Sequence, residues 1–368
     1  MNPMSTVEIQ DFPLWGKMKK HRSILSFDLE ITARCNNDCR HCYINLPAND
    51  QQPRAKELSV QEISDIADQA VKLGAVWVVV SGGEPLLRED FSEIFLLLKR
   101  KGLLVSLFTN ATLINEAHIE LFRKYPPRDI EVTVYGATAE SYERVTCRPG
   151  SFTAFSNGLN RLMESGIRVR LKAMALRSNV HELPEIAAFC RLHTKDYFRF
   201  DPQLHLRFDR DEARNQLIRA ERLTPEEIVA LERGDGERFS ALQHGCDTLI
   251  NEELTHNCDD HLFICGLGQG SFTVSYDGKF RLCSSLWAPE MIYDLRQGSL
   301  RDAWEIFVPK VLAMRSRCAD YFENCRSCSL FNLCLWCPAH SWLETGQLDM
   351  PVDYFCQVAR ARAAAIQE

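Results

Sequence analysis

The 368-residue sequence has no run of about 18 or more apolar residues, so no membrane-spanning helix is expected. Its first 22 residues lack the apolar stretch and small-residue cleavage site of a secretory signal. Basic residues are not in excess, because 43 Lys and Arg stand against 50 Asp and Glu. The net charge of −7 argues against a general nucleic-acid-binding surface. These absences predict a cytoplasmic protein with no membrane or nucleic-acid partner.

Cysteine, by contrast, is abundant, with fifteen residues in the chain. A disulfide framework is typical of short secreted proteins, and this sequence is neither short nor visibly secreted. The composition, 45% hydrophobic and 25% charged, is that of a globular protein with a proper core. We therefore expect reduced, metal-binding cysteines rather than disulfides.

The first cysteine group is Cys35, Cys39 and Cys42, at C-x3-C-x2-C spacing directly after the apolar run 24–31. Thiolates are the usual ligands of iron–sulfur clusters, and a [4Fe–4S] cluster normally takes four of them. Three close cysteines can hold three irons and leave the fourth open to a small molecule. A zinc knuckle or three reduced buried thiols are the alternatives at this point.

Apolar runs alternate with amphipathic segments between residues 23 and 208. Strands are expected at 24–31, 75–80, 103–109, 129–135, 167–174 and 198–206. Helices are expected between them, the first opened by the capping box of Ser59 and Glu62 and the second by Asp90 with Glu93. About six strands with helices between them predict a parallel α/β sheet. The cysteines follow the first strand, at the edge where parallel barrels carry their chemistry.

Three further motifs fall at the same edge. Ser81-Gly82-Gly83-Glu84-Pro85 follows the second strand, where glycines allow close approach of a ligand and Glu84 can accept a hydrogen bond from an ammonium group. Thr109-Asn110-Ala111-Thr112 follows the third strand, and Thr133 with the Tyr135-Gly136 turn ends the fourth. A plain strand-to-helix turn is the alternative for the first of these motifs.

The cysteine spacing, with Gly-Gly-Glu-Pro about 40 residues later, resembles the signature of radical S-adenosylmethionine (radical SAM) enzymes. The resemblance implies a partial (β/α)6 TIM-type barrel over residues 23–208, after an N-terminal extension of residues 1–22. It implies a [4Fe–4S] cluster on the three cysteines whose open iron chelates SAM, and cleavage of SAM to a 5′-deoxyadenosyl radical.

The resemblance also implies SAM contacts. These are Gly82, Gly83 and Glu84 at the amino group, Thr109 and Asn110 near the ribose, Thr133, and Arg144 or Arg148 at the carboxylate. Ala111 departs from the family, which has glycine there. A solvated surface residue is the alternative for each arginine.

The fifth expected strand carries Arg168, Arg170 and Lys172 on one face and apolar residues on the other. Three cations on a strand face are costly to bury unpaired. That face therefore lines a wet barrel mouth, or its cations pair with carboxylates. Lys172 lies nearest the functional edge and is predicted to contact an anion.

Residues 209–257 are rich in charge and predict one or two surface helices that connect two domains, one of them starting at Thr224-Pro225. Nearby histidines, His205, His244 and His256, are assigned no role.

A second cysteine array occupies residues 258–368. Cys265 and Cys283 flank a predicted hairpin with Asp277-Gly278 as its turn, Cys325-x2-Cys328-x5-Cys334-x2-Cys337 follows, and Cys356 closes the array. This pattern resembles the SPASM domain, a C-terminal extension of one branch of radical SAM enzymes. Only the step from Cys334 to Cys337 departs, with two intervening residues where three are usual.

The SPASM resemblance implies two auxiliary [4Fe–4S] clusters, and hence three clusters in all. The outer cluster would use Cys325, Cys328, Cys334 and Cys356, and the inner one Cys265, Cys283 and Cys337 with Cys258 as a plausible fourth ligand. Zinc ribbons use similar cysteine pairs and are the alternative. Four cysteines are left over: Cys147, Cys190, Cys246 and Cys318. Most are expected to be buried thiols, with Cys246 and Cys318 as spare candidates for the inner site.

By analogy, the leading hypothesis is an enzyme that abstracts hydrogen from a ribosomally made peptide, with a flavodoxin- or ferredoxin-type electron donor. Only 34 residues precede Cys35, fewer than a winged-helix leader-binding domain needs. If the substrate is a leader-bearing peptide, a separate leader-binding protein or another surface of this protein must bind it. Sulfatase maturases place an aspartate where this sequence has Ser284, which disfavours that subgroup. The alternatives are oxidation of a small molecule such as an alcohol, and a non-enzymatic iron–sulfur electron carrier or regulator.

Overall fold

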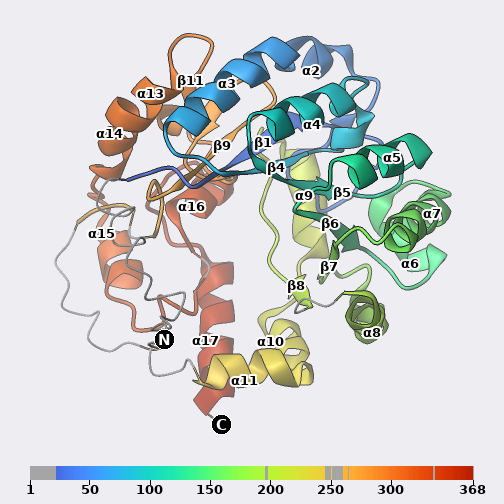
Figure 1. Ribbon diagram of the computed structural model, residues 1–368. Helices are drawn as coiled ribbons and strands as arrows, with labels where there is room; N and C mark the ends of the chain where they lie inside the picture. The colour runs from blue at the N-terminus through green and yellow to red at the C-terminus, as the bar shows by residue number, and fades with distance from the viewer. Residues whose placement is uncertain are drawn as a thin grey trace, which may run out of the picture.

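The computed structural model describes residues 22–194, 198–244, 250, 260–263, 265–334 and 336–367. In this part of the chain the core is a nine-stranded sheet in the order β11-β10-β9-β1-β4-β5-β6-β7-β8 (Figure 1). Six neighbouring strands run parallel: β1 (Ser26–Thr32), β4 (Trp77–Gly82), β5 (Leu104–Thr109), β6 (Asp129–Val134), β7 (Val169–Met174) and β8 (Arg199–Asp201). The expected α/β partial barrel is confirmed.

The last of these strands is shorter than the sequence predicted. We expected a strand over 198–206, but β8 ends at Asp201. Pro202 follows, and proline has no N–H with which to continue a ladder. Residues 202–205 instead line the cavity described below.

Helices pack on the outer face of the parallel strands (Figure 1). They are α3 (Val60–Lys72), α4 (Phe91–Arg100), α5 (Glu116–Lys124), α6 (Ala139–Thr146), α7 (Ser151–Glu164) and α8 (Leu183–His193). The capping box of Ser59 and Glu62 is present at the start of α3, as predicted. Asp90 precedes α4 without capping it, because its carboxylate binds Arg88 instead. The sequence did not predict α6 or α2 (Gln51–Lys56).

Strand β7 separates apolar from charged residues as its alternation predicted. Leu171 and Ala173 are buried on the helix side, whereas Lys172 faces the barrel interior and forms an ion pair with Glu131 at 2.5 Å. Arg170 lies 3.9 Å from the same glutamate. The cationic face is therefore both wet and paired with carboxylates.

The predicted hairpin after Cys265 is present as β9 (Ser271–Val274) and β10 (Lys279–Arg281), and β11 (Tyr293–Asp294) pairs with β10. Strand β9 also pairs in parallel with β1, so the C-terminal segment continues the barrel sheet. Phe27 and Phe272 stack across this junction with ring centroids 5.2 Å apart. The sequence pattern gave no indication of this pairing.

Three helices form the connector: α9 (Glu212–Glu221), α10 (Pro225–Gly234) and α11 (Gly236–His244). Thr224 and Glu227 make a capping box at the start of α10, where a helix start was predicted. Helix α10 has the one-sided character of a surface helix, because Ile228 and Glu232 are buried whereas Glu226, Ala230 and Arg233 are exposed. Helix α10 lies beside α17 (Asp353–Gln367), the last helix of the chain (Figure 1).

The remaining elements are short. They are β2 (Arg34–Cys35), β3 (Leu46–Pro47), η2 (Pro85–Leu87), η3 (Val180–Glu182), η5 (Pro289–Met291), α13 (Leu300–Asp302), η6 (Ala303–Phe307), α14 (Val308–Leu312), α15 (Ala319–Tyr321), η7 (Phe322–Arg326) and α16 (Pro338–Thr345). Among the described residues, no helix combines the length and the apolar character needed to cross a membrane.

Candidate active site

The cysteine loop follows β1 and is held from two sides. Arg34, which precedes Cys35, forms a buried ion pair with Glu57 at 2.7 Å. On the other side, the backbone N–H groups of Asp38 and Arg40 donate to carbonyl oxygens at the end of α6. The loop is thus fixed by hydrogen bonds that do not use its thiols.

All three thiols line one cavity of about 820 Å³. Burial, followed by Glu84, raises the pKa of Cys35 to about 12. The pKa of Cys39 is raised well above its ordinary value, first by burial and then by Cys42 and Cys35. Three buried thiols that disfavour one another's ionisation would gain from a cationic centre that binds them as thiolates.

Unpartnered polar atoms surround the thiols. Within the described structure, Asn37 Nδ2 and Oδ1, His41 Nδ1 and Gln203 Nε2 are buried without a hydrogen-bond partner, and all three residues line the same cavity. Buried polar groups are normally satisfied, so these atoms indicate a site shaped for a bound group. The donor set fits a thiolate-ligated cluster with a polar cofactor beside it. Sequence reasoning assigned these three residues no role: Asn37 and His41 stand between the cysteines of the first loop, and Gln203 belongs to no recognised motif.

Gly82 and Gly83 line the cavity at the end of β4. Gly82 has a φ of +132°, and a Cβ built on it would lie 2.0 Å from the carbonyl oxygen of Thr32. A Cβ on Gly83 would lie 2.3 Å from the carbonyl oxygen of Arg34. Both glycines are thus required first by the close passage of the cysteine-loop backbone, rather than by a ligand alone.

Glu84 is fully buried and holds two strand ends together. Its carboxylate accepts hydrogen bonds from Thr109 Oγ1 and from the backbone N–H groups of Asn110 and Leu86. Burial raises its pKa to about 7, although these donors oppose the shift. A contact between Glu84 and an ammonium group stays a prediction.

Asn110 connects the end of β5 to the cysteine loop. Its Nδ2 lies 3.7 Å from Cys35 Sγ and donates to Asn36 Oδ1 at 3.0 Å. Ala111 has a φ of +61°, the left-handed conformation that favours glycine, which accounts for the residue that the family has there. Thr109, Asn110 and Thr133 all line the cavity, as the predicted SAM contacts require.

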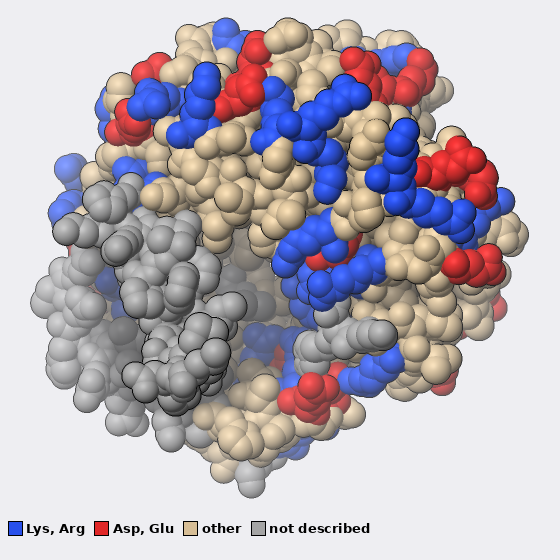
Figure 2. All heavy atoms as spheres, viewed as in Figure 1, with Lys and Arg blue, Asp and Glu red and all other residues tan. Residues whose placement is uncertain are grey.

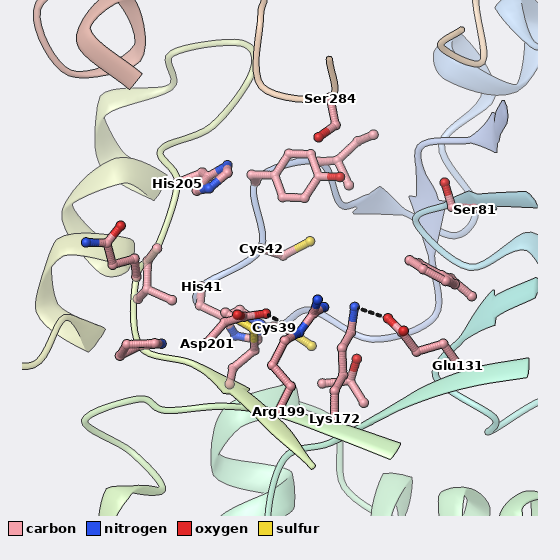
Figure 3. A pocket seen from close by; sticks show the side chains of 18 of the residues that line it. Cys39, His41, Cys42, Ser81, Glu131, Lys172, Arg199, Asp201, His205 and Ser284 are labelled. Carbon is pink, nitrogen blue, oxygen red and sulfur yellow. Dashed lines mark ion pairs between the residues drawn. The ribbon is translucent and has the colours of Figure 1, made fainter. Parts of the chain in front are cut away.

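Of the basic residues predicted to contact SAM or another anion, one lines the cavity and two do not. Lys172 reaches the cavity and pairs with Glu131 (Figure 3). Arg144 pairs with Glu140 on the exposed side of α6, and neither it nor Arg148 lines the cavity. A role for either arginine at a SAM carboxylate stays a prediction that this geometry does not favour.

Figure 3 shows His205 and Ser284 on the side of the cavity opposite Lys172 and Glu131. His205 Nδ1 lies 2.7 Å from Ser285 Oγ, and its ring lies 4.2 Å from that of His340. Burial, then His340 and Arg222, lower its pKa to about 3. This half-buried histidine was assigned no role from the sequence, because a lone histidine carries no signal by itself.

Four C-terminal cysteines surround a second, small cavity of about 40 Å³. They are Cys325, Cys328, Cys334 and Cys356, the set expected for the outer auxiliary cluster. Burial, followed by Cys356, Cys334 and Cys328, raises the pKa of Cys325 to about 12. Four thiols around one cavity fit the ligand number of a [4Fe–4S] cluster.

The expected inner set is brought together in part. Burial raises the pKa of Cys283 to about 11, and Cys337 and Cys265 add to the shift, so the three thiols lie close enough to interact. Cys258, the proposed fourth ligand, and the spare Cys246 lie outside the described residues. Cys318 contacts Met350, Cys190 is buried in the core, and Cys147 is exposed. Over the described chain, no three His, Cys, Asp or Glu side chains are arranged to hold one single metal ion.

The family model described as the radical SAM superfamily matches residues 29–190. These residues, which make up less than half of the chain, are similar in sequence to that superfamily. An AdoMet-dependent heme synthase of Nitratidesulfovibrio vulgaris is 26% identical over 44% of this chain and 43% of its own length. A probable GTP 3′,8-cyclase of Methanococcus maripaludis is 27% identical over 50% of this chain and 62% of its own length. The chain thus spans less than two thirds of these relatives.

Two solved structures share the fold of the radical SAM domain and of the segment that follows it. Streptococcus suis SuiB, bound to its precursor peptide SuiA, is 16% identical with a TM-score of 0.66, covering 97% of this chain and 84% of SuiB. The anSMEcpe structure with bound AdoMet is 13% identical with a TM-score of 0.64, covering 93% of this chain and 96% of that one.

Proposed function

We propose that the chain is a radical SAM enzyme with a C-terminal SPASM domain, and that it modifies a ribosomally made peptide. One observation carries the proposal. A single cavity is lined by the three N-terminal thiols, by the strand-end motifs predicted to bind SAM, and by C-terminal residues including Ser284 and His340. A substrate in this cavity would lie between the SAM site and the cysteine-rich segment.

The proposed roles follow from the contacts. Cys35, Cys39 and Cys42 would hold a [4Fe–4S] cluster, which when loaded with SAM supplies a 5′-deoxyadenosyl radical. Asn110 supports Cys35 through its Nδ2 contact with the thiol, and Glu84 fixes Asn110 by accepting its backbone N–H. These contacts hold Cys35 and Asn110 in fixed positions relative to each other.

The wall residues would position the substrate and limit access of water. Phe108, Leu204 and Tyr43 contribute apolar surface to the cavity, which would protect a radical from quenching by solvent or buffer. Lys172 and Glu131 satisfy each other's charge at the barrel centre. The eight predicted C-terminal ligands would hold two auxiliary clusters that relay an electron or bind the substrate.

A peptide substrate is supported by the two structures of similar fold, since SuiB was solved with its precursor peptide SuiA and anSMEcpe with the Kp18Cys peptide. Small-molecule oxidation is the second candidate, because the sequence relatives include a heme synthase and a probable GTP cyclase. A flavodoxin- or ferredoxin-type donor, a separate leader-binding protein and a cytoplasmic location remain part of the proposal.

The test is anaerobic reconstitution of the full chain, followed by incubation with SAM and dithionite. The proposal expects 5′-deoxyadenosine and about eleven to twelve irons per chain, as three cubane clusters require. An iron–sulfur carrier or regulator would bind iron but release no 5′-deoxyadenosine. A colourless protein, or one that binds zinc in the first cysteine loop, would contradict the proposal.

A further inference from the structure

A triad of charged side chains joins two connector helices to the last helix of the chain. Glu232 of α10 accepts from Arg362 of α17 through both carboxylate oxygens, at 2.7 and 3.0 Å. Arg238 of α11 donates to the same carboxylate at 2.9 Å. All three side chains line the main cavity. The triad therefore forms a wall of the candidate active site, not only a contact between helices.

The triad also protects the edge of the sheet. Arg238 Nη1 donates to the carbonyl oxygen of Phe200 in β8 at 2.9 Å, and its guanidinium lies 4.4 Å from the Phe200 ring centroid. Arg362 Nη1 donates to the carbonyl oxygen of Leu333, beside Cys334. Two guanidinium groups thus share one carboxylate where the barrel, the connector and the C-terminal segment meet.

Charge does not balance on this wall. Four cations and three carboxylates from β6, β7, β8 and the triad line it, which leaves one positive charge: Lys172, Arg199, Arg238 and Arg362 against Glu131, Asp201 and Glu232. Arg199 is 3.6 Å from Asp201, and its side chain is half exposed. Figure 2 shows Lys and Arg side chains gathered beside the hollow in the middle of the face viewed.

The opposite wall has the other sign. Asp28 and Glu30 of β1 line the cavity there, and the glutamate is paired with Arg281. The cavity is therefore polarised from β1 to the triad, which would orient a substrate with a negative group at one end.

Two arginines around one carboxylate leave an uncompensated charge in a place where the side chains of Arg362 and Glu232 are 7% and 2% exposed. Buried ion pairs of this kind often contribute little to stability compared with apolar side chains of equal size. A carboxylate ligand would compensate the extra charge, and charge-assisted hydrogen bonds to guanidinium are strong and geometrically specific.

Resting on the proposed function, we propose that the Arg238–Glu232–Arg362 triad, with Arg199 on the same wall, is an anion subsite that binds a carboxylate of the substrate. The carboxylate comes from an acidic side chain or C-terminus of a peptide, or from a small carboxylic acid. Substrates without a negative group are therefore selected against.

The test uses the reconstituted full chain with SAM and a fluorescein-labelled decapeptide that carries five glutamates, compared with the same peptide carrying glutamines. Fluorescence anisotropy should give a Kd for the glutamate peptide that is about tenfold or more below that for the glutamine peptide. This is the gain expected from one additional charge-assisted hydrogen bond. Equal binding of the two peptides, or binding of neither, overturns the inference.

Variants separate an anion subsite from a merely structural contact. Arg238→Gln should remove most of the preference for glutamate. Glu232→Gln keeps the shape of the side chain and adds one net positive charge to the wall, so the glutamate peptide should bind more tightly. A structural triad would instead weaken or leave unchanged the binding of both peptides in both variants. Arg191→Gln, which breaks a pair with Asp235 in the same connector but outside the cavity, should leave the preference unchanged.

A competition experiment distinguishes a peptide carboxylate from that of a small molecule. A small tetracarboxylic acid that displaces the labelled peptide at equal or lower concentration points to a small-molecule ligand, whereas weak competition points to a peptide. Formation of 5′-deoxyadenosine without substrate is measured in parallel. Its absence in the wild-type chain refutes the proposed function, whereas normal formation without a preference for glutamate refutes only the subsite.

Discussion

Arg281 of β10 and Glu30 of β1 form an ion pair that is buried on both sides, with side chains 0% and 2% exposed. The guanidinium also lies 3.5 Å from the ring centroid of Trp287, and its Nη1 donates to the carbonyl oxygen of Ser284 at 2.6 Å. Since Cys283 follows β10 and the first cysteine loop follows β1, this pair fixes the two cysteine-bearing segments relative to each other.

Removing one partner of this pair should be strongly destabilising. Arg281→Met leaves the Glu30 carboxyl group buried without a counter-charge, and we expect the free energy of unfolding to fall by about 3–5 kcal/mol. The double variant Glu30→Gln/Arg281→Met should lose less than the sum of the single variants, because no buried charge remains unpaired. Anaerobic denaturation followed by tryptophan fluorescence measures these values.

The surface pair of Arg301 and Glu305 provides the control. It is an exposed i,i+4 pair at 3.0 Å, so Arg301→Met should cost only about 0.5 kcal/mol or less. Additive losses at Glu30 and Arg281 would show that the two side chains do not depend on each other.

Substitutions in the two cysteine arrays should both lower the iron content, but only those in the first array should abolish SAM cleavage. Cys42→Ala should lose about four irons and all 5′-deoxyadenosine formation, because it removes a ligand of the predicted SAM-binding cluster. Cys328→Ala should also lose about four irons but keep SAM cleavage. Cys190→Ala, at a buried thiol packed in the barrel core, should change neither quantity. Near four irons in the wild-type protein would remove the auxiliary-cluster proposal.

Gly82 and Gly102 offer a matched pair of glycines with positive φ. A Cβ on Gly82 would lie 2.0 Å from the carbonyl oxygen of Thr32, whereas one on Gly102 would meet nothing within 4 Å. Gly102→Ala should therefore cost only the left-handed backbone penalty, about 1 kcal/mol. Gly82→Ala should cost several times more and lower the yield of cluster-loaded protein. Thermal unfolding and iron content measure the two effects, and equal losses would contradict the close passage of the two backbones.

The strands and helices of the barrel could be predicted because their signals are local. The capping box of Ser59 and Glu62 predicts a helix start, and the apolar runs predict buried parallel strands. The pairing of β9 with β1 could not be predicted, because residues 26–29 and 271–274 are distant in sequence and no short-range pattern encodes their register. Cys283, which follows β10, is therefore carried by the same sheet as the first loop, which spacing alone did not indicate.

The candidate site also has features that the sequence predicted and features that it did not. The thiols and strand-end motifs were predictable because their spacing is fixed by chemistry. The environment was not: Glu84 turned out to bind backbone N–H groups rather than to face the cavity, and Arg144 pairs on the surface. The triad of Arg238, Glu232 and Arg362 joins three helices, and such charged residues read from sequence as ordinary solvated positions.

His205 makes stability depend on pH. Its folded pKa of about 3 lies below the usual 6.5 of an unfolded histidine, because burial and the nearby His340 and Arg222 oppose a positive charge. The unfolded state therefore binds the proton more readily between these values, and stability is lost as pH falls below about 6.5. At pH 5 the loss should be about 2 kcal/mol relative to pH 7.5, at 1.36 kcal/mol per pH unit.

His205→Gln should remove this part of the pH dependence, because glutamine takes up no proton in either state. A smaller slope should remain, since burial also lowers the pKa of His41 to about 4. His244→Gln, at an exposed histidine that contacts Ser240 of its own helix, is the matched control and should keep the wild-type profile. Denaturation curves at pH 5.0, 6.0 and 7.5 compare the three proteins. An unchanged profile in His205→Gln would mean that this histidine is solvated or charged in the folded protein, and the packed wall of His205, Ser285 and His340 would then be wrong.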